Sequence, residues 1–338
     1  MKKMGIFMGF LALLFALPYP LLAQKYNVHV LQVSKVAVFE NGYQGFIEAL
    51  KAHGLVQGDN LTITRHIIDA DLDAGLWKKV GILFQIRKTA SKIVEEKPDL
   101  VLTIGTPATR YSKDKLASAG IPVVFSCVAN PVAAGCPSMT NGGPGTTGAT
   151  IYIDPHDVIK ITKLALPHMK SMGIIHCDDD NAIAFAEEAR KKGAKLGVRV
   201  LTKQVGKSDK IAPAAQELIA QGIDAFGIPP DTYYALRNNE PSKDILAITR
   251  EKKIPAVAFM TSGSKGCILY VGPSLRKSGF YAGEKAARIL KQGFKPEAMP
   301  IEKQDDLTIL SDTDAIRHLG ITIPIEILQL AKPFTDTM

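Results

Sequence analysis

Residues 97–108 read KPDLVLTIGTPA. The segment at 100–104 is short and almost wholly apolar, which is typical of a strand buried on both faces of a parallel sheet. Gly105 follows it, and Thr106 with Pro107 then begins a helix, because proline is favoured in the first helical turn. A strand, a glycine turn and a helix in this order predict one βα unit of an α/β protein.

The same alternation of strand and helix continues on both sides of this stretch, and it predicts right-handed βαβ units. The expected strands are residues 28–33, 61–66, 100–104, 123–125, 149–153, 172–177, 198–205, 225–228, 256–260 and 267–271. The expected helices are residues 41–53, 77–95, 182–197, 211–221 and 242–252. One further helix opens at Asp154 and Pro155, which suit the N-cap and the first helical position.

The two halves of the chain repeat a short pattern. Residues 223–231 read IDAFGIPPD and correspond to the segment around residues 98–107, while residues 253–256 correspond to residues 120–123. The pattern aligns the same strand ends in two similar domains, and open α/β sheets bind ligands at the carboxyl ends of their strands. We therefore expect Thr106 and Asp231 to face each other across a cleft.

The overall composition is that of an ordinary folded protein. The chain has 338 residues, of which 46% are hydrophobic and 22% charged, and its formal net charge is +8. This length suggests two domains, and the composition excludes disordered, collagen-like and disulfide-stabilised miniprotein classes. The charge is mild for the length and does not argue for a nucleic-acid partner.

The first 23 residues have the layout of a secretory signal peptide. Lys2 and Lys3 precede an apolar run at residues 6–17, then come two prolines and a small residue, Ala23, before the expected cleavage. Removing 23 of the 338 residues leaves 315, with 39 basic and 33 acidic residues and a charge of +6. A retained membrane anchor is the alternative, and no cysteine follows the run to carry a lipid. We expect a periplasmic protein.

Export places the four cysteines in an oxidising compartment. Cys127 and Cys136 lie close together in sequence, so a local disulfide and two free thiols are both open. Cys177 and Cys267 fall on separate predicted strands and are expected to be small buried side chains. No cysteine and histidine pair has the spacing of a zinc site, and we expect no metal and no cofactor.

Motifs of common enzyme classes are missing. The chain has no glycine-rich dinucleotide or nucleoside-triphosphate loop, no GxSxG elbow and no HExxH motif. An acidic segment, residues 178–181, follows one predicted strand and precedes a helix. A turn with an N-cap explains it best, and Asp179 is kept as a candidate ligand contact.

Several motifs together resemble a known family. They are GFIEAL at 45–50, KPDLVLTIGTPA at 97–108, IPVVF at 121–125, NPV at 130–132 and LGITIP at 319–324. In order and spacing they resemble the ABC-transporter substrate-binding proteins of the tryptophan/tyrosine type, which have the type I periplasmic-binding-protein fold. The resemblance covers nearly all of the chain after the leader.

The resemblance implies two doubly wound parallel-sheet lobes, joined by crossing hinge strands and closing on a small ligand. Lobe one is expected at residues 24–150 plus 273–300, and lobe two at residues 151–272 plus 301–338. In such a fold the ligand lies between strand ends and helix N-termini, whose free N–H groups and dipoles favour a carboxylate.

Four lobe-one residues are candidates for contacts with this ligand. The Thr106 hydroxyl and the N–H of Ala108 stand at the start of a helix, where they suit an anion. Ser126 and Asn130 follow the next strand and offer further hydrogen bonds. A plain N-cap is the alternative for Thr106, and the two roles are compatible.

Lobe two offers a second set of candidates. Asp231 ends a predicted strand and suits an ammonium group, with a helix cap as the alternative. Thr232, Thr261 and Ser262 are its polar neighbours. Tyr152 and Tyr270 lie near the expected crossings, where they stack on an aromatic ligand or pack at the hinge.

Two positions depart from the family pattern. Lys35-Val36-Ala37 replaces a common Glu-His-Pro after the first strand, and Met260-Thr261-Ser262-Gly263 stands where an acidic residue is common. Both changes predict a more positive cleft with Lys35 in it. We therefore expect a ligand that is more negative than a free aromatic amino acid, or one that lacks its ammonium group.

The resemblance implies a monomeric, non-enzymatic solute-binding protein that delivers an amino-acid-like or carboxylate-bearing ligand to an ABC permease of the inner membrane. A sensory partner that docks on a membrane receptor is one alternative. An exported α/β enzyme is another, since catalytic triads assemble from distant segments.

Overall fold

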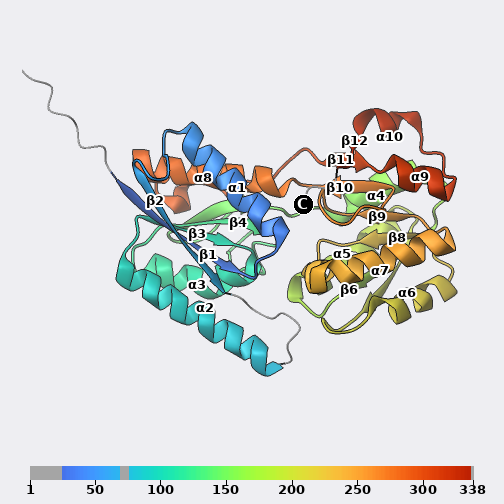
Figure 1. Ribbon diagram of the computed structural model, residues 1–338, viewed down its shortest axis with the longest axis horizontal. Coiled ribbons are helices and arrows are strands. Elements are labelled where there is room, and N and C mark those ends of the chain that lie inside the picture. Colours follow the sequence, from blue (N-terminus) through green and yellow to red (C-terminus); the bar gives the residue numbers. More distant parts are fainter. Residues whose placement is uncertain (1–24, 69–75, 336–338) are drawn as a thin grey trace, which may run out of the picture.

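The computed structural model describes residues 25–68 and 76–335. The predicted signal peptide lies outside the described residues. Within them, no helix combines the length and the apolar character that crossing a bilayer requires. Two lobes lie side by side, each built on its own sheet (Figure 1).

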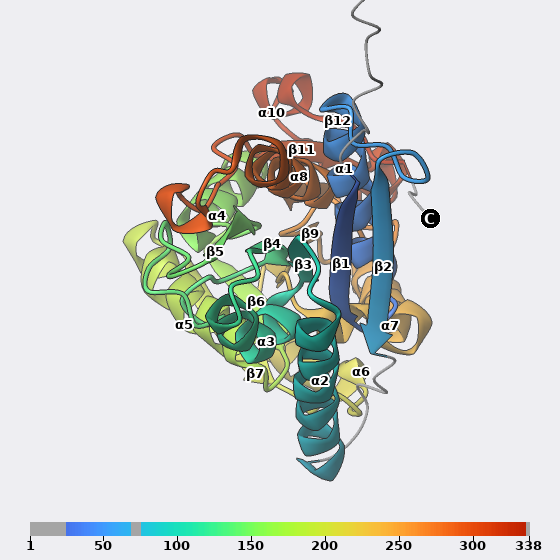
Figure 2. The ribbon, with the colours of Figure 1, turned by 90° about the vertical axis from the view of Figure 1, so that its left-hand side faces the viewer.

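Lobe one contains a five-stranded, all-parallel sheet in the order β2-β1-β3-β4-β5. Its strands are β1 (Tyr26–Val33), β2 (Leu61–Ile68), β3 (Leu100–Ile104), β4 (Val123–Val128) and β5 (Thr146–Thr150). One face is covered by α1 (Ala37–Ala52) and α8 (Leu275–Gln292), the other by α2 (Leu76–Glu96) and α3 (Thr106–Ser118) (Figure 2). Because both faces are covered, the central strand β3 is buried throughout, as its apolar run predicts.

Lobe two contains a seven-stranded sheet in the order β12-β11-β10-β9-β8-β6-β7. Its strands are β6 (Ser171–His176), β7 (Arg199–Gln204), β8 (Ala225–Ile228), β9 (Ala256–Ala258), β10 (Leu269–Gly272), β11 (Thr308–Ser311) and β12 (Lys332–Pro333). Its helices are α4 (Pro155–Ala165), α5 (Asp180–Lys195), α6 (Ile211–Ala220), α7 (Leu236–Lys252), α9 (Thr313–Leu319) and α10 (Ile325–Leu330), with short 3-10 helices η1 (Thr232–Ala235) and, in lobe one, η2 (Pro296–Ala298). Only the β10–β11 pairing is antiparallel among the described ladders.

The two sheets repeat one topology. The order β2-β1-β3-β4-β5 in lobe one corresponds to β7-β6-β8-β9-β10 in lobe two. This correspondence explains the short pattern that the two halves of the sequence repeat, and it makes β3 and β8 equivalent strands. The predicted fold class, two α/β lobes on parallel sheets, is confirmed.

Three chain segments connect the lobes: residues 151–154, 273–274 and 301–307. They are hydrogen-bonded to one another or to the neighbouring strand. Thr150 N donates to Glu302 O at 2.8 Å, and the Gln304 side chain both accepts from Ser274 N and donates to Ser274 O at 2.9 Å. The connection is therefore a laterally bonded set of strands rather than a single flexible linker.

Helix α8 follows the second connection and packs tightly on α1. Gly42 and Gly45 on α1 face Gly279 and Gly283 on α8, and a Cβ on any of these glycines would overlap atoms of the opposite helix or of β4. The glycines of the GFIEAL motif region thus permit a backbone contact between the helices. This contact fixes the returning chain to lobe one.

Some expected boundaries differ from the structure. The predicted crossing strand at 149–153 is wrong: β5 ends at Thr150 within the lobe-one sheet, and the crossing itself is irregular. Helix α7 begins six residues earlier than expected, and residues 237–239 interrupt it in left-handed conformations. Asp154 caps α4 as predicted, accepting a hydrogen bond from His156 N at 2.8 Å.

All four cysteines are described, and all are free and buried. Cys127 packs into the core beneath α1 and α8, whereas Cys136 packs with Phe125 and Ile301 in a separate cluster. The disulfide that the sequence left open does not form, because the two thiols belong to different packing environments. Cys177 and Cys267 are buried in lobe two as expected.

Candidate ligand-binding site

A cavity of about 460 Å³ lies between the lobes. Its walls are the carboxyl ends of strands and the first turns of the following helices, from both lobes. This is the location at which open α/β sheets bind ligands, and the volume lies within the usual range for small-molecule sites.

Most of the cavity wall is apolar. Strand ends, helix starts, helix α2 and the first crossing contribute large hydrophobic side chains. They include Phe39, Leu83, Ile86, Ile104, Ile151, Tyr234, Phe259, Met260 and Leu275. A ligand with a large apolar group would bury it here, and the few polar groups would set its orientation.

The lobe-one wall centres on the start of α3. Gly105 has φ +85°, and a Cβ there would lie 2.9 Å from the Phe39 ring, so glycine allows Phe39 to pack against this turn. Among the described residues no side chain caps the first turn of α3. Thr106, Pro107 and Arg110 line the cavity beside these free N–H groups, and a helix N-terminus of this kind favours an anion.

The lobe-two wall centres on the start of α5. Asp179 stands at the N-cap but caps no N–H; its carboxylate instead pairs with Lys207 Nζ at 2.9 Å. Asn181, Pro230 and Thr232 complete this side of the cavity. The acidic segment therefore supplies a charged pair at the cavity wall in addition to starting a helix.

Three polar atoms around the cavity have no hydrogen-bond partner within the described residues. Ser34 Oγ, Asn181 Oδ1 and Ser262 Oγ are buried, and the structure shows no hydrogen bond to any of them within its described residues. All three residues line the cavity, one from lobe one and two from lobe two. Buried polar atoms are nearly always bonded in folded proteins, so three such atoms at one cavity mark where the polar groups of a ligand would bind.

Asp231 lines the cavity but is already engaged. Its carboxylate accepts from Cys177 N at 2.7 Å and from Tyr233 N at 2.9 Å, and the Cys177 thiol lies 3.1 Å away. Burial raises the pKa of Asp231, opposed by these hydrogen bonds. Of the two roles considered for Asp231, the structure shows the helix cap, at η1, and the carboxylate also holds the end of β6.

Charged side chains at the cavity are paired and of both signs. Arg110 of lobe one and Asp180 of lobe two form an ion pair at 2.8 Å that spans the gap between the lobes. Lys35 is exposed, lies near enough to help lower the pKa of Glu40, and does not line the cavity. The more positive cleft that we expected from Lys35 is therefore absent, because Asp180 balances Arg110 and Asp179 balances Lys207.

The family model of ABC transporter substrate-binding proteins matches residues 27–334. The chain belongs to this family. It is thus a binding protein rather than an enzyme, as expected. It is 25% identical over 298 residues to a protein named tyrosine-binding protein from Clostridioides difficile strain R20291, which covers 87% of this chain and 81% of that relative.

Solved structures show the same fold. A domain from Streptococcus pneumonia in complex with L-Trp has a TM-score of 0.75 at 21% identity, covering 92% of this chain and 99% of that one. A ligand-free, open substrate-binding protein with adhesive properties from Clostridium difficile has a TM-score of 0.70 at 23% identity, covering 92% and 100%. Sugar-binding proteins share the fold more distantly, which confirms the type I periplasmic-binding-protein architecture.

The structure brings five of the predicted contact residues to the cavity of this substrate-binding protein: Thr106, Asp179, Asp231, Thr232 and Ser262. Thr106 and Asp231 thus line the same cavity, from equivalent strands of the two lobes.

Two more candidates line a small annex of about 30 Å³ beside the main cavity. The Asn130 side chain accepts from Ala133 N at 3.1 Å, and Tyr152 donates to Glu188 at 2.8 Å. Burial and the adjoining Glu188 carboxylate raise the pKa of Tyr152 to about 12. Both side chains already have partners within the protein.

The remaining candidates do not line either space. Ala108 and Ser126 are fully buried in lobe one, and Thr261 donates to Pro273 O at 3.1 Å. Tyr270 is a core residue of lobe two: its ring stacks on Phe334 at 3.8 Å, and its hydroxyl donates to Ser264 O at 2.7 Å. Of the two roles considered for Tyr270, the structure shows packing.

Several cavity residues were not predicted. Ser34 directly follows β1, and Asn181 belongs to the acidic segment after β6. Ligands bind at the carboxyl ends of strands in open α/β sheets, so the polar residues that follow each strand are all candidates, and these two are among them. Arg110 lies within helix α3, and Lys207 lies in the loop after β7, a segment for which no site residue was predicted. Their presence at the cavity depends on how α3 and the loop after β7 are oriented, which no local pattern reports.

Proposed function

We propose that this protein is the exported receptor of an ABC importer and that it captures an amino acid with a large apolar side chain between its lobes. The set of unpaired oxygens on Ser34, Asn181 and Ser262 in an otherwise apolar cavity carries this proposal. It requires a ligand with several polar atoms at one end and an apolar body at the other. The names of relatives that bind tyrosine and L-Trp support the same class.

A zwitterionic ligand fits the charges of the cavity. Its carboxylate would lie at the uncapped first turn of α3 beside Thr106, where free N–H groups and the helix dipole favour it. Its ammonium group would lie near Asp179, joining the ion pair with Lys207. Thr232 and Ser262 would add hydrogen bonds from lobe two, and Asp231 would hold its loop in place.

Capture would proceed by closure of the hinge. Ligand contacts on both lobes stabilise a closed form relative to an open one, which shifts the population toward closure. The ion pair between Arg110 and Asp180 joins the lobes in the described conformation, and the three bonded crossings are the natural axis. The expected leader at residues 1–23 would direct export, and the monomer would then meet its permease.

Binding is tested by calorimetry and thermal melts of the purified protein with three matched sets of ligands. The sets are apolar amino acids, the corresponding acids without the amino group, and the corresponding amines. We expect tight binding only for amino acids with large side chains, and a weaker signal for each truncated set. Binding of the acids alone, or of none of the three sets, would contradict the zwitterion assignment.

A further inference from the structure

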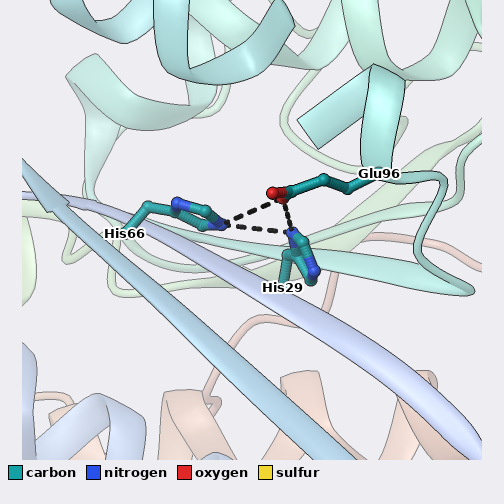
Figure 3. A group of neighbouring side chains, drawn as sticks. All are labelled: His29, His66 and Glu96. Atoms are coloured by element: carbon teal, nitrogen blue, oxygen red, sulfur yellow. Dashed lines mark hydrogen bonds and ion pairs between the residues drawn. The ribbon is translucent and has the colours of Figure 1, made fainter. Parts of the chain in front are cut away.

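A second cluster of ligand-bearing side chains lies in lobe one, away from the cavity. His29 of β1, His66 of β2 and Glu96 of α2 come together on the sheet face that α2 covers (Figure 3). In the parallel β1–β2 ladder Leu31 lies opposite His66. His29 is two residues before Leu31, so its side chain is on the same face of the sheet and lies diagonally from His66. Glu96 is the last residue of α2, which places its carboxylate over both rings.

The three facing atoms have the spacing of a metal site. His29 Nδ1 lies 3.1 Å from His66 Nε2, and Glu96 Oε2 lies 3.4 Å from His29 Nδ1 and 4.0 Å from His66 Nε2. Tetrahedral ligands about 2.0–2.1 Å from a zinc ion are separated by roughly 3.3–3.4 Å. The cluster therefore needs only small side-chain shifts to hold such an ion.

The electrostatics of the cluster favour a cation. His29 Nδ1 and His66 Nε2 face each other at 3.1 Å, so at least one of these nitrogens presents a lone pair in the hydrogen bond between the rings. Glu96 stands at the C-terminal end of α2, where the helix dipole is negative. Lys92 opposes a metal, but it pairs with the other Glu96 oxygen at 3.7 Å and is 64% exposed, so it is free to move into solvent.

We propose that His29, His66 and Glu96 bind one divalent transition-metal ion of the zinc type, with a water molecule as fourth ligand. Two imidazoles and a carboxylate are ordinary zinc ligands. His29 is buried while Glu96 is 37% exposed, so the ion enters and the water binds on the Glu96 side. Without a metal, the same contact is a hydrogen bond between the two rings.

Such an ion would tie α2 to the sheet. The C-terminal residue of α2 would ligate the metal, while Val80, Leu83 and Ile86 nearer its N-terminus line the cavity between the lobes. The ion is thus placed to hold the helix that forms part of the ligand wall. It does not depend on the identity of the ligand.

The test measures zinc binding to protein from which a chelator has removed all metal. Calorimetry gives the affinity, and metal analysis after dialysis gives the number of bound ions. We expect one equivalent of Zn²⁺ and a rise in melting temperature of about 5 °C at a hundredfold excess over the dissociation constant. His66→Gln and Glu96→Gln should each weaken zinc binding by more than about 100-fold. Loss of a residue that only hydrogen-bonds to a metal ligand costs about 10- to 100-fold, so a larger loss indicates direct ligation. Co²⁺ in place of zinc should give the visible absorption of a tetrahedral site.

His168→Gln is the matched control, because His168 is an exposed histidine of lobe two. It should leave zinc binding unchanged. The two test residues are more exposed than His29, so their variants should keep the fold, which circular dichroism checks. Absence of zinc binding, or zinc binding that survives both variants, would overturn the proposal and leave a hydrogen-bonded histidine pair.

Discussion

The ends of β3 and β8 are equivalent in topology but differ in their chemistry. After β3, Gly105 turns the chain and leaves the first N–H groups of α3 without a side-chain cap among the described residues. After β8, Asp231 accepts two backbone N–H bonds and lies beside a thiol. One end is open toward a ligand, whereas the other is closed by its own carboxylate. Equal position in a repeated fold thus does not give equal roles.

The largest effect is expected at the closed end. Asp231→Ala leaves the N–H groups of Cys177 and Tyr233 buried without their acceptor, at a cost of about 1–3 kcal/mol for each unsatisfied group. We expect the free energy of unfolding to fall by about 2–4 kcal/mol, measured by urea denaturation. Ligand affinity should fall only through displacement of the loop after β8, because Asp231 itself does not contact the ligand in our proposal. A stable variant with abolished binding would instead make Asp231 a direct ligand contact.

The pH dependence sharpens this point. Burial raises the pKa of Asp231 above its ordinary value of 3.8, so the folded state binds this proton more tightly than the unfolded state does. The resulting stability is present at low pH and is lost as the pH rises from about 4 through the raised pKa. Relative to Asp231→Asn, the native protein should lose stability over this range. A difference that does not change between pH 4 and pH 7 would contradict the assignment.

The open end is tested at its turn. Gly105→Ala places a Cβ against the Phe39 ring and strains a residue with φ +85°, so we expect a loss of about 1–3 kcal/mol in unfolding free energy together with weaker ligand binding. Gly120→Ala is the matched control, because Gly120 also has positive φ but no atom lies within 4 Å of its Cβ position. The control should show the backbone strain alone. Equal effects of both variants would show that Phe39 packing is unimportant.

Much of the fold could be predicted because burial leaves a local mark. The apolar runs at 100–104 and 225–228 coincide with β3 and β8. Strands that are covered on both faces are apolar throughout, so the run starts and stops where the strand does. The boundaries of α7 and β5 were harder to predict. Residues 237–239 adopt left-handed conformations that break the helical pattern, and β5 ends where the chain leaves one sheet for the other lobe.

The site was predicted only in part, for a physical reason. Thr106 and Thr232 lie where the chain turns after β3 and β8, so topology alone brings them to the cavity. Tyr270 also lies on a strand, but its side chain points into the core against Phe334, and this choice of face depends on packing. The cluster of His29, His66 and Glu96 has no sequence signature, because its members come from three elements that only the folded sheet brings together.

A smaller effect is expected from the hydroxyl at the open end. Thr106→Val keeps the shape of the side chain and removes one hydrogen-bonding group, whose net value is about 0.5–1.5 kcal/mol. Affinity for the amino acid should fall by roughly 2- to 10-fold, measured by calorimetry, while the unfolding free energy changes little. Thr232→Val is the lobe-two counterpart. Unchanged affinity in both variants would remove these hydroxyls from the site.

The smallest effect concerns the contact between the two walls. Arg110 and Asp180 join the lobes at 2.8 Å, but their side chains are 42% and 72% exposed, and exposed ion pairs contribute about 0–1 kcal/mol. Arg110→Met and Asp180→Asn should each weaken ligand binding by less than about 5-fold, and 0.5 M salt should weaken the native protein toward the variants, because salt screens the pair. The double variant should equal either single one. A much larger loss for Arg110→Met alone would mean that Arg110 contacts the ligand directly, and the open end would then bind its anion with a side chain as well as with the α3 backbone.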